Sequence, residues 1–266
     1  MRTPWRLWRG LARAPLTAYA LLAYAFLFFP SVVIILFSFN QSKVTVWPPR
    51  GFTLDWYGEI LRDPTLLESI ANSLIVASLA TIGSVILGTM AAIALSRYHF
   101  RGKRLVYAAT LAPIALPGLV TGIAMLSYFE YVGLQRSLVT VILAHIVFTL
   151  PFVVTIVIAR LSNFDAAVEE AALDLGASPL RSFLTVTLPI IAPSVAGAAL
   201  VVFALSFDEF IITFFVIGNQ STLPLKIWSM MRLGIAPTIN AVASIIIVLS
   251  TILVLIGTRF VRVVGR

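Results

Sequence analysis

The sequence predicts an all-α protein embedded in a membrane, with six transmembrane helices. Of its 266 residues, 60% are hydrophobic and only 11% are charged, and the mean hydropathy is +1.01. A soluble domain of this size carries about a quarter charged residues. Stretches without charge, each long enough to cross the hydrocarbon core as a helix of about 20 residues, recur along the chain. A water-soluble globular protein is therefore excluded.

We expect one transmembrane domain over residues 1–266, with spans at about 16–39, 69–96, 105–128, 138–159, 190–217 and 235–258. Four arginines precede the first stretch, but its apolar part is too long for a cleaved signal peptide. On the second span, small residues recur every fourth position and allow close approach of a helix from this chain or from a partner subunit. They are Ala80, Ser84, Gly88 and Ala92.

Prolines interrupt three later spans, at Pro113, Pro117, Pro151, Pro189 and Pro193. A proline leaves a backbone carbonyl without its helical donor, which is tolerated where protein or a wet cavity satisfies it. Such kinks are equally typical of ordinary membrane helices and of helices beside a translocation pathway.

The distribution of basic residues predicts that both termini are cytosolic. Thirteen Lys and Arg residues lie in the two termini and in the loops around 97–104 and 160–181, against six in the three other loops. Cytosolic loops carry the excess of positive charge. The same bias accounts for the net charge of +8 without a nucleic-acid partner.

Several kinds of chemistry are excluded for this chain. It has no cysteine, and so no disulfide, thiolate nucleophile or cysteine-bound metal. It lacks a phosphate-binding GxxxxGK[ST] loop; the nearest fragment, Gly102-Lys103-Arg104, has neither the upstream glycine nor the hydroxyl residue. We therefore expect no catalytic site, metal or cofactor in this chain, and any ATP to be hydrolysed by another subunit.

The loop 160–188 is too polar for the membrane and predicts a short amphipathic helix. Asn163 or Asp165 can cap its start, Gly176 fits its end, and Ser178-Pro179 begins a second helix. On a helical wheel, Ala167, Val168, Ala171, Ala172 and Leu175 share one arc, and Asp165, Glu169, Glu170 and Asp174 occupy the other. A small apolar face with an acidic flank fits a groove on a cytosolic protein better than it fits lipid headgroups, where basic residues are favoured.

This loop resembles the EAA loop of ABC importer permeases. The similarity rests on Glu170-Ala171-Ala172, then Gly176, Val186 and Leu188-Pro189 at the family spacing, with valine where isoleucine is usual. The resemblance implies a type I importer permease fold, and a coupling helix at residues 165–176 that docks on an ATPase. Its expected contact residues are Asp165, Glu169, Glu170, Ala171, Ala172, Asp174 and Gly176. The implied partners are a second homologous permease, two ATP-binding subunits that hold ATP and Mg²⁺, and an extracytoplasmic solute-binding protein, in a bacterial inner membrane.

Two adjacent acids, Asp208 and Glu209, interrupt the fifth predicted span. A carboxylate at mid-bilayer costs roughly 2.5–3.5 kcal/mol on insertion scales, so the pair needs a compensating environment. Three interpretations stay open: a structural ion pair, a wet vestibule without a ligand role, or contact with a cationic substrate. Phe207 and its neighbours could add cation–π attraction.

The surrounding residues resemble the second permease of spermidine/putrescine ABC importers. Leu205 to Phe210, Phe214 to Gly218 and Leu223 to Met230 carry the similarity, which extends from about Phe29 to Leu255. It implies import of a polyamine, for which Asp208, Glu209 and Phe207 are substrate-pathway candidates. Tyr128 and Glu130, at the outer end of the third predicted span, either anchor the helix at the membrane interface or line the same pathway. Import of another small solute, such as an amino-acid-like compound or an iron ion, is the alternative. A proton-coupled secondary transporter and an intramembrane enzyme using His145 are less favoured, because neither an inverted repeat nor a nucleophile–base pair is evident.

Overall fold

The computed structural model describes the backbone of residues 5–43, 47–233 and 237–264, and the side chains of 15–43, 47–232 and 237–252. Within these residues the regular structure is helical, apart from one isolated bridge between Asn40 and Phe52. The all-α prediction is therefore confirmed. The chain divides into two compact units, Met1–Asp63 with Met230–Leu249, and Pro64–Ser229 with Ser250–Arg266.

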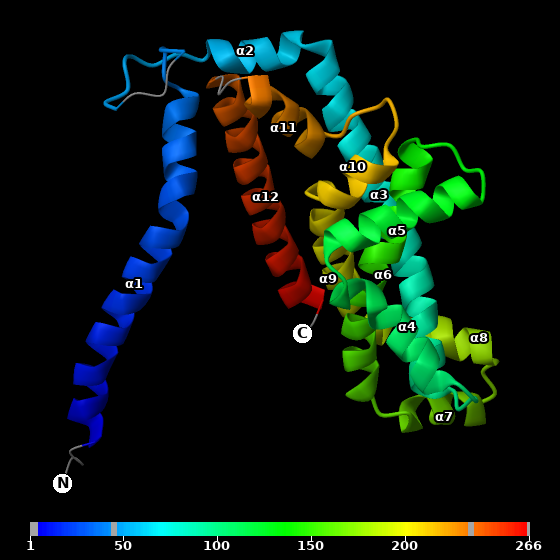
Figure 1. Ribbon diagram of the computed structural model, residues 1–266. Helices are drawn as coiled ribbons and strands as arrows, with labels where there is room; N and C mark the ends of the chain where they lie inside the picture. Colours follow the sequence, from blue (N-terminus) through cyan, green and yellow to red (C-terminus); the bar gives the residue numbers. More distant parts are fainter. Residues whose placement is uncertain (1–4, 44–46, 234–236, 265–266) are drawn as a thin grey trace. The chain divides into compact units, whose positions relative to one another are not determined.

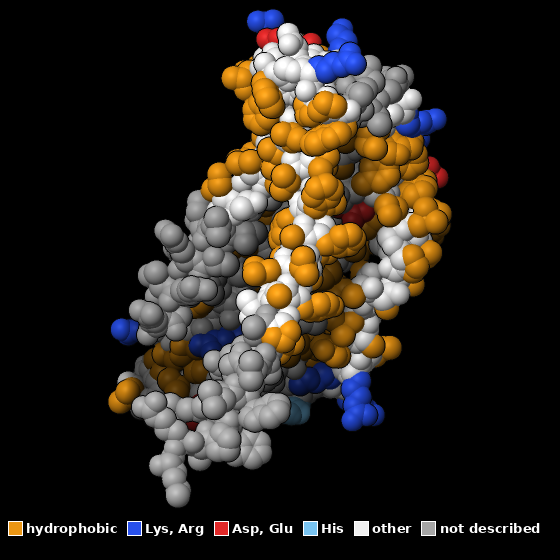
Figure 2. Space-filling view, turned by 90° about the vertical axis from the view of Figure 1, so that its left-hand side faces the viewer, with side chains coloured by type: hydrophobic (Ala, Val, Ile, Leu, Met, Phe, Trp, Pro, Cys, Tyr) orange, Lys and Arg blue, Asp and Glu red, His pale blue; other side chains and the backbone are white. Residues whose placement is uncertain are grey.

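The first unit contains α1 (Trp5–Ser38), α2 (Asp55–Arg62) and the first part of α12 (Pro237–Val264). Figure 2 looks onto α1, whose described side chains are almost all hydrophobic and are mostly exposed from Pro15 to Pro30, as expected for a helix in contact with lipid or another subunit. Polar contacts order the chain that follows. The indole of Trp56 donates to the carbonyl of Asn40 (2.8 Å), and the hydroxyl of Thr238 on α12 donates to Glu59 on α2 (3.0 Å).

The second unit is built around α3 (Pro64–Arg97), α6 (Leu138–Ser162) and α9 (Leu188–Phe207), which pack against one another (Figure 1). Its other helices are α4 (Lys103–Ala115), α5 (Gly118–Tyr131), α7 (Ala167–Asp174), α8 (Pro179–Ser182), η1 (Phe183–Thr187), α10 (Ile211–Val216) and the start of α11 (Leu223–Leu233). Its apolar core has two clusters. One joins α3, α5, α6 and α10, and the other joins α3, α6 and α9.

The small-residue stripe on α3 faces α6 of the same chain. Ala80, Ser84 and Ala92 are fully buried, and a Cβ placed on Gly88 would lie 2.7 Å from Cβ of Val153. Of the two readings that the sequence left open, the structure thus confirms packing within the chain, where a missing side chain brings two helix backbones together.

Four helices among the described residues are long and apolar enough to cross a membrane, namely Pro15–Ser38, Pro64–Arg97, Leu138–Ser162 and Pro179–Phe207. The segment expected as the third span is broken instead: α4 and α5 meet at an angle of 113°. Leu116 is extended (ψ 139°) because the ring of Pro117 disfavours helical geometry in the residue before it. The count of six spans and the cytosolic termini stay predictions.

Helix α5 lies directly on α10. A Cβ on Gly122 would be 2.7 Å from the ring of Phe215 and 3.3 Å from Cα of Ile212, so only glycine permits this approach. The chain after α10 returns to α3, where the amide of Asn72 donates to the carbonyl of Ser221 (2.9 Å). These contacts hold the segment around α10 against α3 and α5.

Candidate functional site: the cytosolic helix and the acidic break

Helix α7, which lies inside the predicted coupling helix, begins and ends at the signals expected from sequence. A carboxylate oxygen of Asp165 accepts the backbone N–H of Ala167 (3.0 Å) at its start. At its end Gly176 adopts φ +87°, and the N–H groups of Gly176 and Ala177 donate to the carbonyls of Leu173 (2.9 Å) and Ala172 (3.0 Å). This pair of backbone hydrogen bonds, together with a glycine in the left-handed conformation, ends a helix sharply. Ser178 then caps α8, and its hydroxyl accepts the N–H of Arg181 (3.3 Å).

One face of α7 is exposed. Glu170, Ala171 and Asp174 are exposed on it, together with Val168. Leu175, the residue after the helix, is 89% exposed, which is unusual for a leucine in a polar loop. This face therefore combines apolar and acidic side chains that nothing in the described part of the chain covers.

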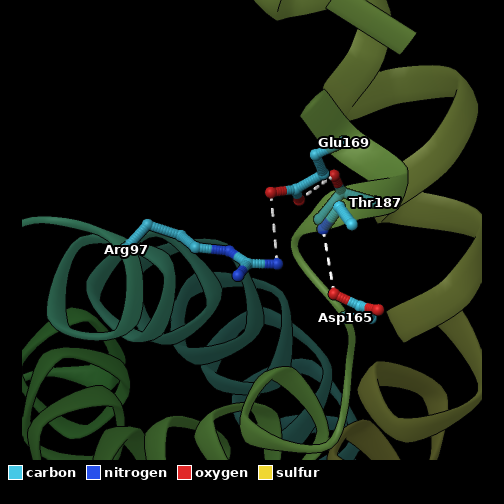
Figure 3. Close-up of polar contacts among 5 residues, drawn as sticks. Arg97, Asp165, Glu169 and Thr187 are labelled. Carbon is cyan, nitrogen blue, oxygen red and sulfur yellow. Dashed lines mark hydrogen bonds and ion pairs between the residues drawn. The ribbon is translucent and has the colours of Figure 1, made fainter. Parts of the chain in front are cut away.

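Glu169 lies on the other side of α7 and contacts its own chain (Figure 3). Its Oε2 is 3.1 Å from Nη2 of Arg97 at the end of α3, and its Oε1 accepts a hydrogen bond from the hydroxyl of Thr187 in η1. The Arg97 guanidinium also lies over the ring of Phe164, 5.2 Å from its centroid. Nothing in the amino-acid sequence indicates this contact, because Arg97, Phe164 and Thr187 are far apart along the chain.

The two acids of the fifth predicted span lie at a break between helices and have different surroundings. Helix α9 ends at Phe207 and α10 begins at Ile211. Glu209 is partly buried, and its Oε1 accepts the N–H of Ile212 (2.8 Å), so it caps the first turn of α10. Asp208 is exposed, and its carboxylate makes no hydrogen bond or ion pair with any described residue.

His145 on α6 connects the two helices that flank this break. It is 1% exposed, with Nδ1 2.8 Å from Oγ of Ser206 on α9 and Nε2 2.8 Å from Oγ1 of Thr213 on α10. Because the Thr213 hydroxyl donates its proton to the carbonyl of Glu209 (2.9 Å), it can only accept from the ring. The ring therefore donates to Thr213 from Nε2. His145 is thus a buried residue that bonds to the helices on both sides of the break.

The other pathway candidates are Phe207, which directly precedes Asp208, and two residues of α5. Phe207 stacks on Phe203 at the end of α9, with ring centroids 6.1 Å apart. Tyr128 and Glu130 are exposed at the end of α5, and Glu130 lines a shallow cavity of about 450 Å³ with Arg136 and Gly218. No group of three acidic or histidine side chains that could hold a metal ion occurs among the described residues.

Comparison with known proteins identifies the family. Residues 84–266 match the family model described as "Binding-protein-dependent transport system inner membrane component". The chain belongs to this family. It is therefore an inner-membrane permease of the ABC importer type, as the EAA loop predicts, and α7 occupies the position of that loop.

Two relatives from Escherichia coli K12 are each 37% identical to this permease. The putrescine transport system permease protein PotI aligns over 256 residues, covering 93% of this chain and 87% of that protein. The spermidine/putrescine transport system permease protein PotC aligns over 241 residues, covering 90% of each. The PotC protein of Haemophilus influenzae is 34% identical over 247 residues, covering 92% of this chain and 95% of that protein.

Solved structures share the fold at low sequence identity. A chain of the bacterial alginate ABC transporter, solved in complex with an alginate pentasaccharide-bound periplasmic protein, superimposes with a TM-score of 0.73 and 16% identity over 98% of this permease and 99% of that chain. A chain of the methionine ABC transporter MetNI gives a TM-score of 0.64 and 19% identity over 76% and 97%. The predicted importer-permease fold is thereby confirmed.

Proposed function

We propose that this permease imports a polyamine, putrescine or spermidine, as part of an ATP-driven complex. The observation that carries the proposal is the 37% identity, over nine-tenths or more of the chain, to permeases named for putrescine and for spermidine/putrescine transport. A polyamine is a linear cation, and the exposed carboxylate of Asp208 has the charge to attract one.

The complex would contain a second permease, two ATP-binding subunits and an extracytoplasmic binding protein. The exposed face of α7 supports this, because its mixture of Val168, Leu175 and the acids Glu170 and Asp174 suits a partner groove with apolar and basic lining. ATP and Mg²⁺ would be bound by the partner subunits. Closure of the ATPases would displace α7 and reorient the spans between outward-open and inward-open states.

Within this permease, Asp208 is the residue that we assign to contact with the cation. It directly follows Phe207 in the chain, and the ring of Phe207 stacks on that of Phe203, so aromatic faces that attract an ammonium group begin at the adjacent residue. Glu209 is the adjacent acidic residue, and we assign it a structural role because its carboxylate already caps α10. The carboxylate of Asp208 bonds to no described residue, so it can bind a substrate without first giving up such a bond.

The test is transport by the reconstituted importer. The permease, its partner permease, the ATPase subunits and the binding protein are placed in liposomes, and uptake of radiolabelled putrescine and spermidine is measured with and without ATP. We expect uptake of at least one of them only when ATP and the binding protein are both present. Uptake of an amino acid or iron instead would refute the polyamine assignment, and uptake by the permease alone with a proton gradient would refute the ATP-driven one.

A further inference from the structure

Helix α7 is too short to hold its own position. It has eight residues, and isolated helices shorter than about 12 residues are marginal in water. Non-helical residues flank it on both sides, Asn163–Ala166 before it and Leu175–Ser178 after it. A force applied to α7 could be absorbed by bending of these two connections, unless side chains tie the helix to the membrane-spanning part of the chain.

Glu169 provides such a tie in two directions. One carboxylate oxygen lies 3.1 Å from the guanidinium of Arg97 at the end of α3, and the other accepts the hydroxyl proton of Thr187 (Figure 3). Arg97 is 23% exposed and Glu169 is 22% exposed, so water screens the pair only partly. The contact with α3 is informative, because no short stretch of chain joins α7 to that helix.

The partners of Glu169 are themselves fixed in place. Arg97 lies over the ring of Phe164. Its Nε and Nη2 are buried without a hydrogen-bond partner among the described residues, so the guanidinium depends on its ion pair with the Glu169 carboxylate. Thr187 is buried in the last position of η1, a π-helical turn that leads directly into α9. Through these two residues, Glu169 joins α7 to the ends of two membrane helices.

We propose that Glu169 is a positioning residue that transmits the displacement of α7 to α3 and α9 through Arg97 and Thr187. It does not serve as a contact with the ATPase. This inference rests on the proposed function, in which an ATPase moves α7. Loss of Glu169 leaves the outer face of α7 intact, so the ATPase still binds and hydrolyses ATP, but a smaller share of its movement reaches the spans.

The experiment compares ATP hydrolysed per substrate imported in the full complex carrying Glu169→Gln, Arg97→Gln or Thr187→Val. Thr185→Val is the matched control, because Thr185 lies two residues from Thr187 in η1 but is exposed, and among the described residues its hydroxyl bonds only to the carbonyl of Arg181 (2.7 Å). We expect the three variants to retain the ATPase subunits. The number of ATP molecules hydrolysed per substrate imported should rise at least about fivefold, which is the lower end of the usual range for coupling between two sites. The control should keep the wild-type ratio.

Two further variants keep the test decisive if a single one fails to assemble. Arg97→Lys keeps the charge but loses the planar group over Phe164, and should give an intermediate ratio. The exchange Arg97→Glu with Glu169→Arg should bring the ratio back toward wild type, which a merely destabilised helix would not do.

Three results would overturn the inference: an unchanged ratio in both Glu169→Gln and Arg97→Gln, an equal increase in Thr185→Val, or loss of ATPase binding in Glu169→Gln. A wrong substrate assignment gives a different result, because the wild-type complex then takes up no polyamine. In that case the ATP hydrolysed per molecule imported is measured with the solute that the binding protein does carry.

Discussion

Asp208 and Glu209 are neighbours of the same charge, yet their surroundings predict opposite results on substitution. Asp208 is exposed and bonds to no described side chain or N–H group, whereas Glu209 accepts the N–H of Ile212 at 2.8 Å. The informative variants are Asp208→Asn, Glu209→Gln and Glu209→Ala. Asparagine removes a charge with little change in shape. Glutamine removes the charge but keeps an oxygen that can cap α10, and alanine removes both.

The expected magnitudes follow from these contacts. Asp208→Asn should change the free energy of unfolding by less than about 0.5 kcal/mol, as an exposed site without partners usually does. Glu209→Ala should lower it by about 1 kcal/mol, the usual cost of losing a helix cap. For transport, attraction between one exposed carboxylate and a cation, screened by water, is worth about 1–2 kcal/mol. Its loss in Asp208→Asn should reduce uptake at low substrate concentration about 5- to 30-fold.

The assay pairs thermal unfolding of the purified complex with initial uptake rates over a range of polyamine concentrations. We expect Asp208→Asn to unfold like wild type and to transport poorly at low concentration, and Glu209→Gln to transport nearly normally. If Asp208→Asn transports normally while Glu209→Gln does not, the assignment of the two roles is wrong. Equal destabilisation by Asp208→Asn and Glu209→Ala would also contradict it.

Three other substitutions test separate parts of the structure. Glu170→Lys reverses a charge on the exposed face of α7. It should weaken binding of the ATPase at least about tenfold, which is about 1.4 kcal/mol, without changing the unfolding temperature of the permease. Normal co-purification of the ATPase would refute the assignment of this face as the docking surface. His145→Ala leaves two buried hydroxyls without their ring partner and should lower the free energy of unfolding by about 2–4 kcal/mol in detergent, against little change for the exposed His99→Ala. Gly88→Ala should cost about 1–3 kcal/mol by the same measurement, because its Cβ would lie 2.7 Å from Val153, and Val153→Ala in the same chain should recover part of that loss.

The boundaries of α7 were predictable from sequence because the residues that set them lie within a few positions of each other. Asp165 binds an N–H two residues ahead, and Gly176 supplies the left-handed conformation that ends the helix. Prolines were less informative. Pro113 lies inside α4, whereas Pro117 coincides with the 113° bend. Which proline breaks a helix depends on whether neighbouring helices satisfy the freed backbone groups, and sequence alone does not reveal that.

The residues that connect distant helices were missed or only partly understood. Arg97 carries a charge typical of an orientation signal, and nothing near it in sequence indicates its contact with Glu169. The sequence presents Asp208 and Glu209 as a pair, but the end of α9 turns one toward solvent and the other toward the N–H groups of α10. The spacing from Glu209 to Ile212 is that of a helix cap and was the one available signal. This signal is hard to recognise, because the apolar residues on both sides of the acids predict one continuous transmembrane helix.

The close approach at Gly122 has a consequence for how the acidic break moves. At this point the backbones of α5 and α10 are separated by too little space for a side chain to change rotamer and absorb a shift. Rotation of α5 about the bend at Pro117 must therefore carry α10 with it, and with α10 the residue Glu209, whose carboxylate caps its first turn. A hinge some ninety residues earlier in the chain would then shift Glu209 relative to Asp208, whose N–H stays bonded to the carbonyl of Ala204 in the last turn of α9 (3.2 Å).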